Sequence, residues 1–126
     1  MLTEVRFPAW SETRSWGLQK MTRRWGDFAM VGAVCVADTD ANGRCRRVRI
    51  VVYGASDCAQ LVREAAGVIE KRIPSAALLR EAARAAAGAV NTRSDLHASA
   101  AYRTELVETL TRRALAQALP AAREAA

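Results

Sequence analysis

The pattern of apolar and polar residues changes its period near Gly54. Before this glycine, apolar residues alternate with polar ones or form short continuous runs, and after it they recur every three or four residues. Alternation is typical of strands, and a period near 3.6 is typical of helices. The sequence therefore predicts about four strands followed by three helices. Because strands and helices do not alternate, we expect an α+β two-layer sandwich, with an antiparallel sheet and all three helices on one face.

The central strand is predicted at Phe28–Asp38, which is nearly all apolar, as in a strand covered on both faces. Gly32 lies within it and would cost stability unless a bulky group or another backbone passes close by. Asn42-Gly43 is a strong hairpin signal. It predicts that Cys45–Tyr53 returns antiparallel to the central strand.

Two further strands are predicted closer to the N-terminus. Leu2–Phe7 alternates apolar and polar residues and stops at Pro8, which is typical of a short edge strand. Trp16–Arg24 is the second of these strands. Trp25-Gly26-Asp27 follows it, and we expect a turn there, with the carboxylate capping free amides of the bend.

Three helices are predicted after Gly54. Ser56 or Asp57 is expected to cap the first, Pro74-Ser75 to open the second, and Ser99 to begin a third that runs to Pro120. Their apolar stripes are Cys58, Leu61, Val62, Ala65, Val68 and Ile69; Leu78, Leu79, Ala82, Ala83, Ala86 and Val90; and Tyr102, Leu106, Leu110, Ala114 and Leu115.

The length of 126 residues fits a single domain with a modest core. We expect residues 1–15 to form a lead-in strand and connector, 16–54 the sheet, 55–119 the helices and 120–126 a frayed tail. The sequence contains no apolar run of about eighteen residues, so no membrane span is predicted. No secretion signal is visible, which predicts a cytoplasmic protein.

Composition excludes several functions. The net charge is +6, but the basic residues are spread along the chain without aromatic platforms or a reading helix, so nucleic-acid binding is not expected. His97 is the single histidine and has no second ligand at a metal spacing. Three cysteines without such spacing are interpreted as buried or idle thiols.

Several short motifs occur in an order that suggests a family. They are Leu2-Thr3-Glu4-Val5-Arg6-Phe7-Pro8; Arg23-Arg24 with Asp27-Phe28-Ala29 and Val31; Ser94-Asp95-Leu96 with Tyr102-Arg103; and Arg113-Ala114-Leu115. On these motifs, the chain resembles the C-terminal domain of the FAD-binding medium subunit of molybdenum hydroxylases, the group of carbon monoxide dehydrogenase and xanthine dehydrogenase. The first motif then resembles the junction that leaves the FAD domain.

The chain also departs from that family. Tyr53-Gly54 stands where paired glycines are usual, and Ile69-Glu70-Lys71 replaces a leucine-x-glycine motif. The glycine-rich loops that hold the FAD pyrophosphate belong to the preceding domain and do not occur here. We therefore expect no cofactor bound by this chain alone, and FAD only within a complete medium subunit.

The resemblance also implies site residues. Gln19, Lys20, Arg23 and Asp27 would lie on the side that faces the flavin, although Arg23 and Asp27 are equally well explained as an ion pair that fixes the strand entry. Trp25 would stack on a ligand or cover the core. Asp27 and Tyr53 are the candidates for proton transfer or hydrogen bonding. Asp95 with Tyr102 and Arg103 is expected to tie the last loop to the last helix.

Three functions remain open on this basis. The first is a flavoprotein domain that packs against an FAD domain and supports electron transfer from molybdenum and iron–sulfur partners. The second is a free-standing small-molecule binder, cyclase or isomerase, in which Arg23, Trp25, Asp27 and Tyr53 line the cavity left by a missing FAD domain. The third is an interaction module such as a homodimer.

Overall fold

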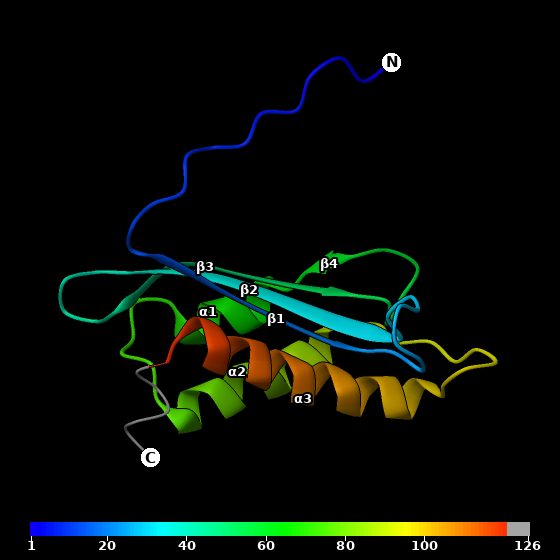
Figure 1. Cartoon of the computed structure of the whole chain (residues 1–126). Helices are drawn as coiled ribbons and strands as arrows, with labels where there is room; N and C mark the ends of the chain where they lie inside the picture. Colours follow the sequence, from blue (N-terminus) through cyan, green and yellow to red (C-terminus); the bar gives the residue numbers. More distant parts are fainter. Residues whose placement is uncertain (121–126) are drawn as a thin grey trace.

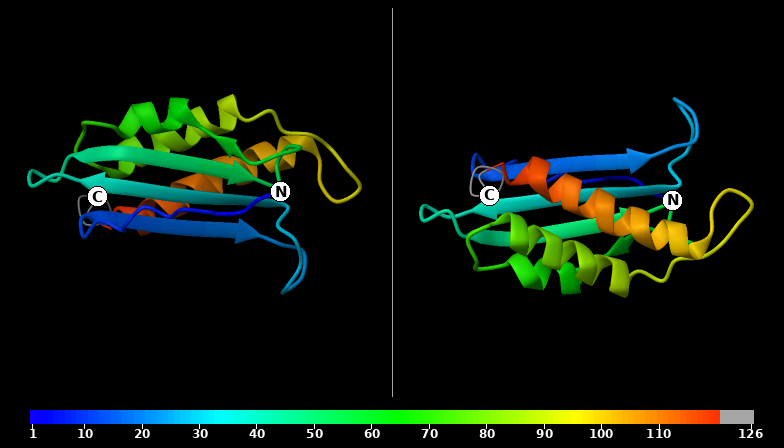
Figure 2. Two further views of the ribbon diagram at one scale, coloured as in Figure 1. Left: turned by 90° about the horizontal axis from the view of Figure 1, so that it is seen from above. Right: turned by 90° about the horizontal axis from the view of Figure 1, so that it is seen from below.

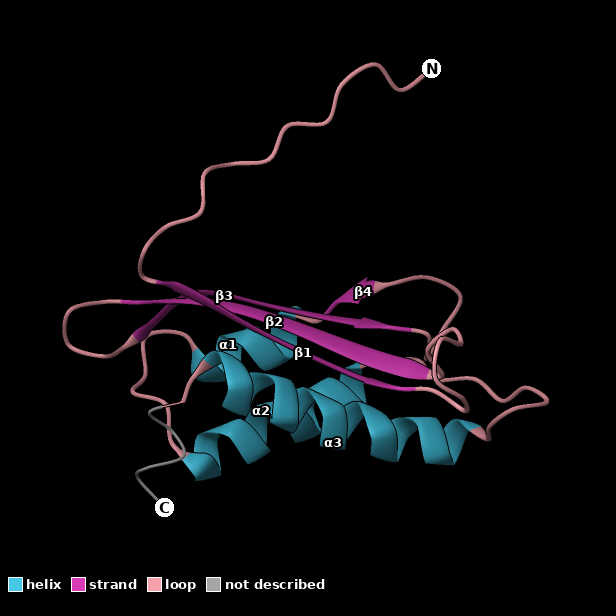
Figure 3. Ribbon diagram, viewed as in Figure 1, coloured by secondary structure: helices cyan, strands magenta, loops and turns pink. Residues whose placement is uncertain are grey.

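The computed structural model describes residues 1–120. A four-stranded antiparallel sheet lies on a layer of three helices, with the elements in the order β1 to β4 and then α1 to α3 (Figures 1 and 3). The strands are β1 (Arg14–Met21), β2 (Val31–Thr39), β3 (Cys45–Tyr53) and β4 (Gln60–Leu61), and the helices are α1 (Arg63–Ile69), α2 (Ala76–Ala89) and α3 (Ala100–Ala118). The predicted α+β sandwich is confirmed, since no helix separates any two strands.

The core lies between the sheet and the helices. Alternate residues of β2 and β3 point toward the helices and are almost fully buried, among them Val31, Cys35 and Ile50. Val48 and Val52 face the same way as Ile50, as the alternation predicts, and Arg49 is exposed on the other side. All three helices cover this one face, and within residues 1–120 the opposite face of the sheet carries no helix (Figure 2).

The central strand is β2, paired with β1 on one side and β3 on the other. Gly32 has the predicted close neighbour, because the ring of Tyr53 lies where a Cβ at position 32 would be, 2.1 Å from the nearest ring atom. Asp40 shapes the β2–β3 hairpin: its carboxylate accepts hydrogen bonds from the amides of Asn42 and Arg44. Gly43 takes the positive φ of 74° that this turn needs.

The strand predicted at Leu2–Phe7 is wrong. These residues lie outside every strand, and the segment 1–13 is mostly exposed. Alternation alone does not make a strand, because a strand also needs a neighbouring edge to pair with. The chain instead enters the sheet at Arg14, whose amide donates to the carbonyl of Ser11.

The first predicted helix begins too early. Residues 60–61 form β4 beside β3, and the amide of Val62 donates to the carbonyl of Ile50, so the chain completes the sheet before α1 starts. Neither Ser56 nor Asp57 caps α1: Ser56 Oγ bonds to the carbonyl of Cys58, and Asp57 forms an ion pair with Arg93. Residues 55–119 therefore hold a short strand as well as the helices.

The other two helices begin as predicted. Ser75 Oγ accepts a hydrogen bond from the amide of Leu78, and Ser99 Oγ accepts one from Tyr102. The third helix ends at Ala118, two residues before Pro120. Residues 121–126, most of the predicted frayed tail, lie outside the described residues. No helix within residues 1–120 is both long and apolar enough to cross a membrane.

Candidate functional site

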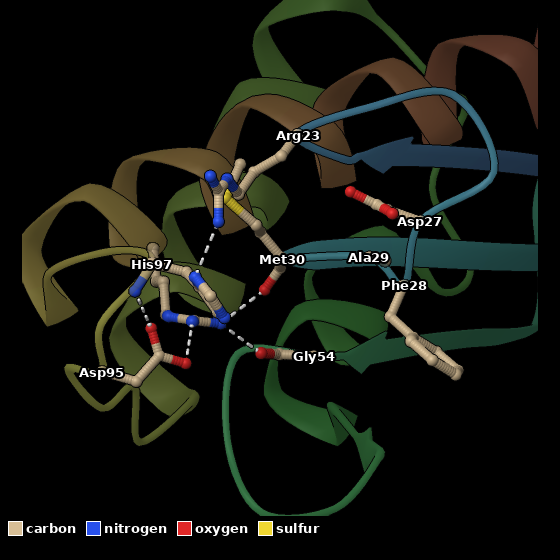
Figure 4. A pocket seen from close by; sticks show the side chains of 9 residues that line it. Arg23, Asp27, Phe28, Ala29, Met30, Gly54, Asp95 and His97 are labelled. Carbon is tan, nitrogen blue, oxygen red and sulfur yellow. Dashed lines mark hydrogen bonds and ion pairs between the residues drawn. The ribbon is translucent and has the colours of Figure 1, made fainter.

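A cavity of about 350 Å³ opens at one end of the sheet, where three connecting segments meet (Figure 4). These are the β1–β2 loop (residues 22–30), the end of β3 at Gly54, and the α2–α3 loop (residues 90–99). Its lining residues are Arg23, Asp27, Phe28, Ala29, Met30, Gly54, Asp95, His97 and Arg103. The cavity thus combines guanidinium, imidazole and carboxylate groups with an apolar wall.

The β1–β2 loop brings two predicted site residues to the cavity. Its ends are joined by the amide of Met30, which donates to the carbonyl of Met21 (2.8 Å). Within it, the amide of Asp27 donates to the carbonyl of Arg24, and Gly26 between them has a φ of 89°. That conformation favours glycine, so the predicted turn at Gly26 is confirmed.

Arg103 of α3 holds the cavity together. Its side chain is 95% buried, Nη1 donates to the carbonyls of Met30 (2.7 Å) and Gly54 (2.5 Å), and Nη2 donates to Asp95 Oδ2 (2.5 Å). One guanidinium therefore ties the start of β2, the end of β3 and the α2–α3 loop to α3. A buried arginine needs this set of partners, because a charge without them is costly to bury.

Asp95 anchors the α2–α3 loop. Its Oδ1 accepts hydrogen bonds from the amides of His97 (2.8 Å) and Ala98 (3.0 Å). Together these contacts lower the pKa of Asp95 to about 2. The hydrogen bond from the His97 amide contributes most, and the Arg103 guanidinium and the Ala98 amide act in the same direction. The predicted link between Asp95 and the last helix is confirmed through Arg103, whereas Tyr102 contributes only its backbone amide, to Ser99.

Arg23 is held by His97, not by Asp27. Its guanidinium lies 2.9 Å from His97 Nδ1, and Figure 4 shows Arg23 turned toward that ring. The proposed ion pair between Arg23 and Asp27 is not formed, and the carboxylate of Asp27 makes no hydrogen bond within residues 1–120. The predicted capping of the bend by this carboxylate is therefore wrong as well. Asp27 lies at the cavity as a hydrogen-bond acceptor without a side-chain partner among residues 1–120.

The other predicted site residues lie elsewhere. Trp25 is fully exposed at the tip of the β1–β2 loop, and Tyr53 lies over Gly32 on the sheet face without helices. Gln19 and Lys20 point to opposite faces of β1: the Gln19 amide donates to Gln117 of α3 (2.9 Å), and Lys20 is exposed. The cavity therefore gathers Arg23 and Asp27 but not Trp25 or Tyr53.

Two residues at this site could not be assigned from the sequence. In the sequence His97 has no second metal ligand at a suitable spacing and no other evident role, yet in the structure it positions Arg23 from 74 residues away. Phe28 belongs to the predicted central strand, but it precedes β2 and is 99% exposed at the rim of the cavity. In residues 1–120, no three His, Cys, Asp or Glu side chains are grouped to hold a metal ion.

The described residues do not form a cradle for a dinucleotide pyrophosphate. Such a cradle needs free amides at a helix N-terminus, usually after a glycine-rich loop. Here the N-termini of α2 and α3 are capped by their own serine side chains, and α1 is a helix of only seven residues. The cavity instead offers a guanidinium donor at Arg23 and a carboxylate acceptor at Asp27.

A family described as the CO dehydrogenase flavoprotein C-terminal domain matches residues 16–118. Among curated proteins, the chain is 32% identical to the 6-hydroxypseudooxynicotine dehydrogenase complex subunit alpha of Paenarthrobacter nicotinovorans over 98% of its own length. It is 35% identical to the nicotine 6-hydroxylase medium subunit of the same organism over 94% of its length. The chain spans about 42% and 41% of these two relatives.

Solved structures give the same result. Carbon monoxide dehydrogenase from Hydrogenophaga pseudoflava, in a form that lacks the Mo-pyranopterin moiety of its molybdenum cofactor, superimposes with a TM-score of 0.82 at 25% identity. The match covers 88% of this chain and 38% of the other. Quinoline 2-oxidoreductase from Pseudomonas putida 86 superimposes with a TM-score of 0.78 at 27% identity, over 86% of this chain and 38% of the other.

Proposed function

The chain belongs to the CO dehydrogenase flavoprotein C-terminal domain family, and from this we propose that it works as the C-terminal domain of an FAD-dependent oxidoreductase subunit. One observation carries the proposal: the sequence and the fold resemble such subunits along nearly the whole chain. The chain corresponds to about two fifths of these relatives, so the remaining functions belong to other parts of the subunit.

FAD is held, on this proposal, by the portion that precedes this domain. The cofactor supplies electron transfer when it is bound, and this chain supplies one wall of its site. Arg23 is the donor on that wall, kept in place by His97, and Asp27 is an acceptor with no partner among the described residues. The loop that carries both is fixed by Arg103 through Met30. These residues orient the ring and exclude water from it.

The proposed partners are an FAD-binding domain and molybdenum and iron–sulfur subunits. Support comes from the relatives, whose names describe a subunit of a dehydrogenase complex, a medium subunit and a medium chain. Each of these names describes one component of an assembly with several subunits.

The proposal is tested by purifying the native assembly through an affinity tag on the C-terminus of this chain. We expect stoichiometric flavin in the absorbance spectrum, and mass spectrometry that identifies an FAD-binding sequence together with molybdenum and iron–sulfur subunits. A colourless preparation without these partners would contradict the proposal. It would favour a free-standing small-molecule binder instead.

A further inference from the structure

Two contacts join the β1–β2 loop to the α2–α3 loop at the cavity, and they differ in their chemistry. The first runs through the buried Arg103, which binds both Met30 and Asp95. The second is the hydrogen bond between Arg23 and His97 (2.9 Å), and both of these residues are exposed. Arginine keeps its proton at any pH that a folded protein meets, whereas histidine ordinarily changes its charge between pH 5 and pH 8. The second contact therefore contains a group that responds to pH.

The contact with Arg23 defines where the neutral His97 ring carries its proton. A guanidinium has donors and no acceptor, so Arg23 donates and His97 Nδ1 accepts. Nδ1 accepts a hydrogen bond when the ring is neutral and its proton is on Nε2. After a second proton binds at Nδ1, this atom can no longer accept, and two cations face each other. Protonation of His97 therefore breaks the hydrogen bond that turns Arg23 toward the α2–α3 loop.

Asp27 offers Arg23 another partner. Both residues belong to the β1–β2 loop and line the same cavity, and Figure 4 shows the carboxylate of Asp27 turned toward it. This carboxylate has no side-chain partner among residues 1–120. The start of β2 stays bound to Arg103 throughout, so the exchange of partners needs a movement within the loop and none of the strands.

The other charged groups that line the cavity with His97 already have partners. On its own loop, Asp95 binds the amides of His97 and Ala98 through Oδ1 and the guanidinium of Arg103 through Oδ2. On α3, Arg103 is neutralised by that same carboxylate. The end of β3 contributes Gly54, which carries no charge. Among the described residues of the cavity, Asp27 is thus the carboxylate left to receive a cation.

We propose that His97 is a pH-sensitive latch on the cavity. With a neutral ring it holds Arg23 and leaves the Asp27 carboxylate open, and with a protonated ring it releases Arg23, which then pairs with Asp27. A ligand group that donates a hydrogen bond to Asp27 accordingly finds this acceptor open at neutral or alkaline pH and occupied in acid. The latch is a property of this chain and does not depend on the proposed function.

The test follows the folded chain by ¹H–¹⁵N NMR between pH 8 and pH 5. His97 is the single histidine, so its ring signals report one protonation step. We expect the backbone amide signals of residues 22–30 to shift with the same midpoint as the ring. Arg23→Met should largely remove this response, because methionine cannot donate to the ring, and His97→Gln should abolish it. The matched control Arg24→Met, at the exposed neighbouring position, should keep it.

The variant Asp27→Asn tests the second position of the latch. At pH 5 its loop loses the contact with His97 without gaining an ion pair. Hydrogen exchange of amides 22–30, corrected for the intrinsic rate at each pH, should then be about two- to fivefold faster than in the wild type, which is the strength expected of an exposed ion pair. At pH 7.5 the two chains should exchange equally.

Two results would overturn the latch: loop amides that do not follow the His97 ring, or a response that survives in full in Arg23→Met. Equal exchange of the wild type and Asp27→Asn at pH 5 would overturn the pairing of Arg23 with Asp27. The proposed function stands in either case, since the composition of the purified assembly tests it separately.

Discussion

At the scale of single residues, two glycines of the sheet show how a missing side chain sets the packing. A Cβ at Gly17 would lie 2.0 Å from the carbonyl oxygen of Ala114, so the absence of a side chain lets α3 approach β1. A Cβ at Gly32 would instead meet the outer ring atoms of Tyr53. A helix backbone cannot move aside without displacing the whole layer, whereas a ring on the helix-free face of the sheet can rotate.

We therefore predict that Gly17→Ala destabilises the chain more than Gly32→Ala. The first substitution should lower the free energy of unfolding by about 3 kcal/mol, and the second by about 1 kcal/mol or less. Urea denaturation of both variants beside the wild type measures this difference. Equal losses would mean that α3 is less tightly seated on β1 than the structure indicates.

The thiols should differ sharply in reactivity. Burial raises the pKa of Cys35 to about 12. The pKa of Cys45 is raised to about 11, mainly by burial and to a smaller extent by the negative charge of Asp40. Cys58 is exposed. With Ellman's reagent near neutral pH, one thiol per folded chain should react quickly and all three after denaturation. The Cys58→Ser variant should lose the fast phase, and a fast phase that persists would contradict the assignment.

The raised pKa values also have a consequence for stability. The folded chain keeps these two thiols protonated, whereas the unfolded chain releases their protons above the ordinary thiol pKa of about 8.5. Their contribution to stability is therefore fully present below that pH and decreases as the pH rises toward 11 and 12.

At the scale of the elements, the arrangement of the loops at the candidate site depends on Arg103, which joins loops that follow different strands and helices. It is one side chain with three partners from three segments. Fixing the β1–β2 loop in this way also fixes Arg23 and Asp27, so the shape of the candidate site depends on a residue of α3.

Arg103→Met should lower the free energy of unfolding by about 3 kcal/mol, since it leaves two carbonyls and a carboxylate without their donor. Hydrogen exchange should quicken for amides of residues 22–30 and 91–99. The control is Arg112→Met, an exposed arginine of the same helix, which should change neither quantity. An Arg103→Met chain with unchanged exchange in the β1–β2 loop would contradict the role given to Arg103.

Acid stability should depend on Asp95. Its pKa is lowered from 3.8 to about 2 in the folded chain, so its contribution is fully present above pH 4 and is lost as the pH falls toward 2. In Asp95→Asn, the loss of stability over this range should be smaller than in the wild type. Thermal melting at pH 5 and pH 3 tests this, with Asp57→Asn as the control, because Asp57 is an exposed carboxylate that pairs with the exposed Arg93.

At the scale of the whole molecule, the layered arrangement divides the surface by role. The helices cover one face of the sheet, the candidate site lies at one end, and the opposite face carries no helix of the described residues (Figure 2). None of these regions offers a cradle of free backbone amides in the described residues. Affinity for FAD should therefore arise only in the assembly.

The purified chain by itself should accordingly be colourless and bind free FAD with a dissociation constant on the order of a millimolar, or not at all, because no helix N-terminus is open to the pyrophosphate. Equilibrium dialysis against FAD measures this. A yellow chain with stoichiometric flavin would contradict it.

Features that depend on neighbouring residues could be predicted from the sequence. The hairpin near Asn42-Gly43 and the starts of the second and third helices near Ser75 and Ser99 were predicted and confirmed. Each depends on local backbone chemistry or on a repeat within one element, so a few consecutive residues suffice to identify it. The family resemblance rested on the same kind of short motif, in a fixed order.

Features that need a partner from far along the chain became visible only in the folded structure. Leu2–Phe7 alternates like a strand but pairs with no strand of the described residues, whereas Gln60–Leu61 looks helical and becomes a strand because it pairs with β3. Arg23 meets His97 across 74 residues, and Arg103 reaches Met30 across 73. Such contacts depend on where the folded layers bring side chains together, and no local pattern in the sequence records that.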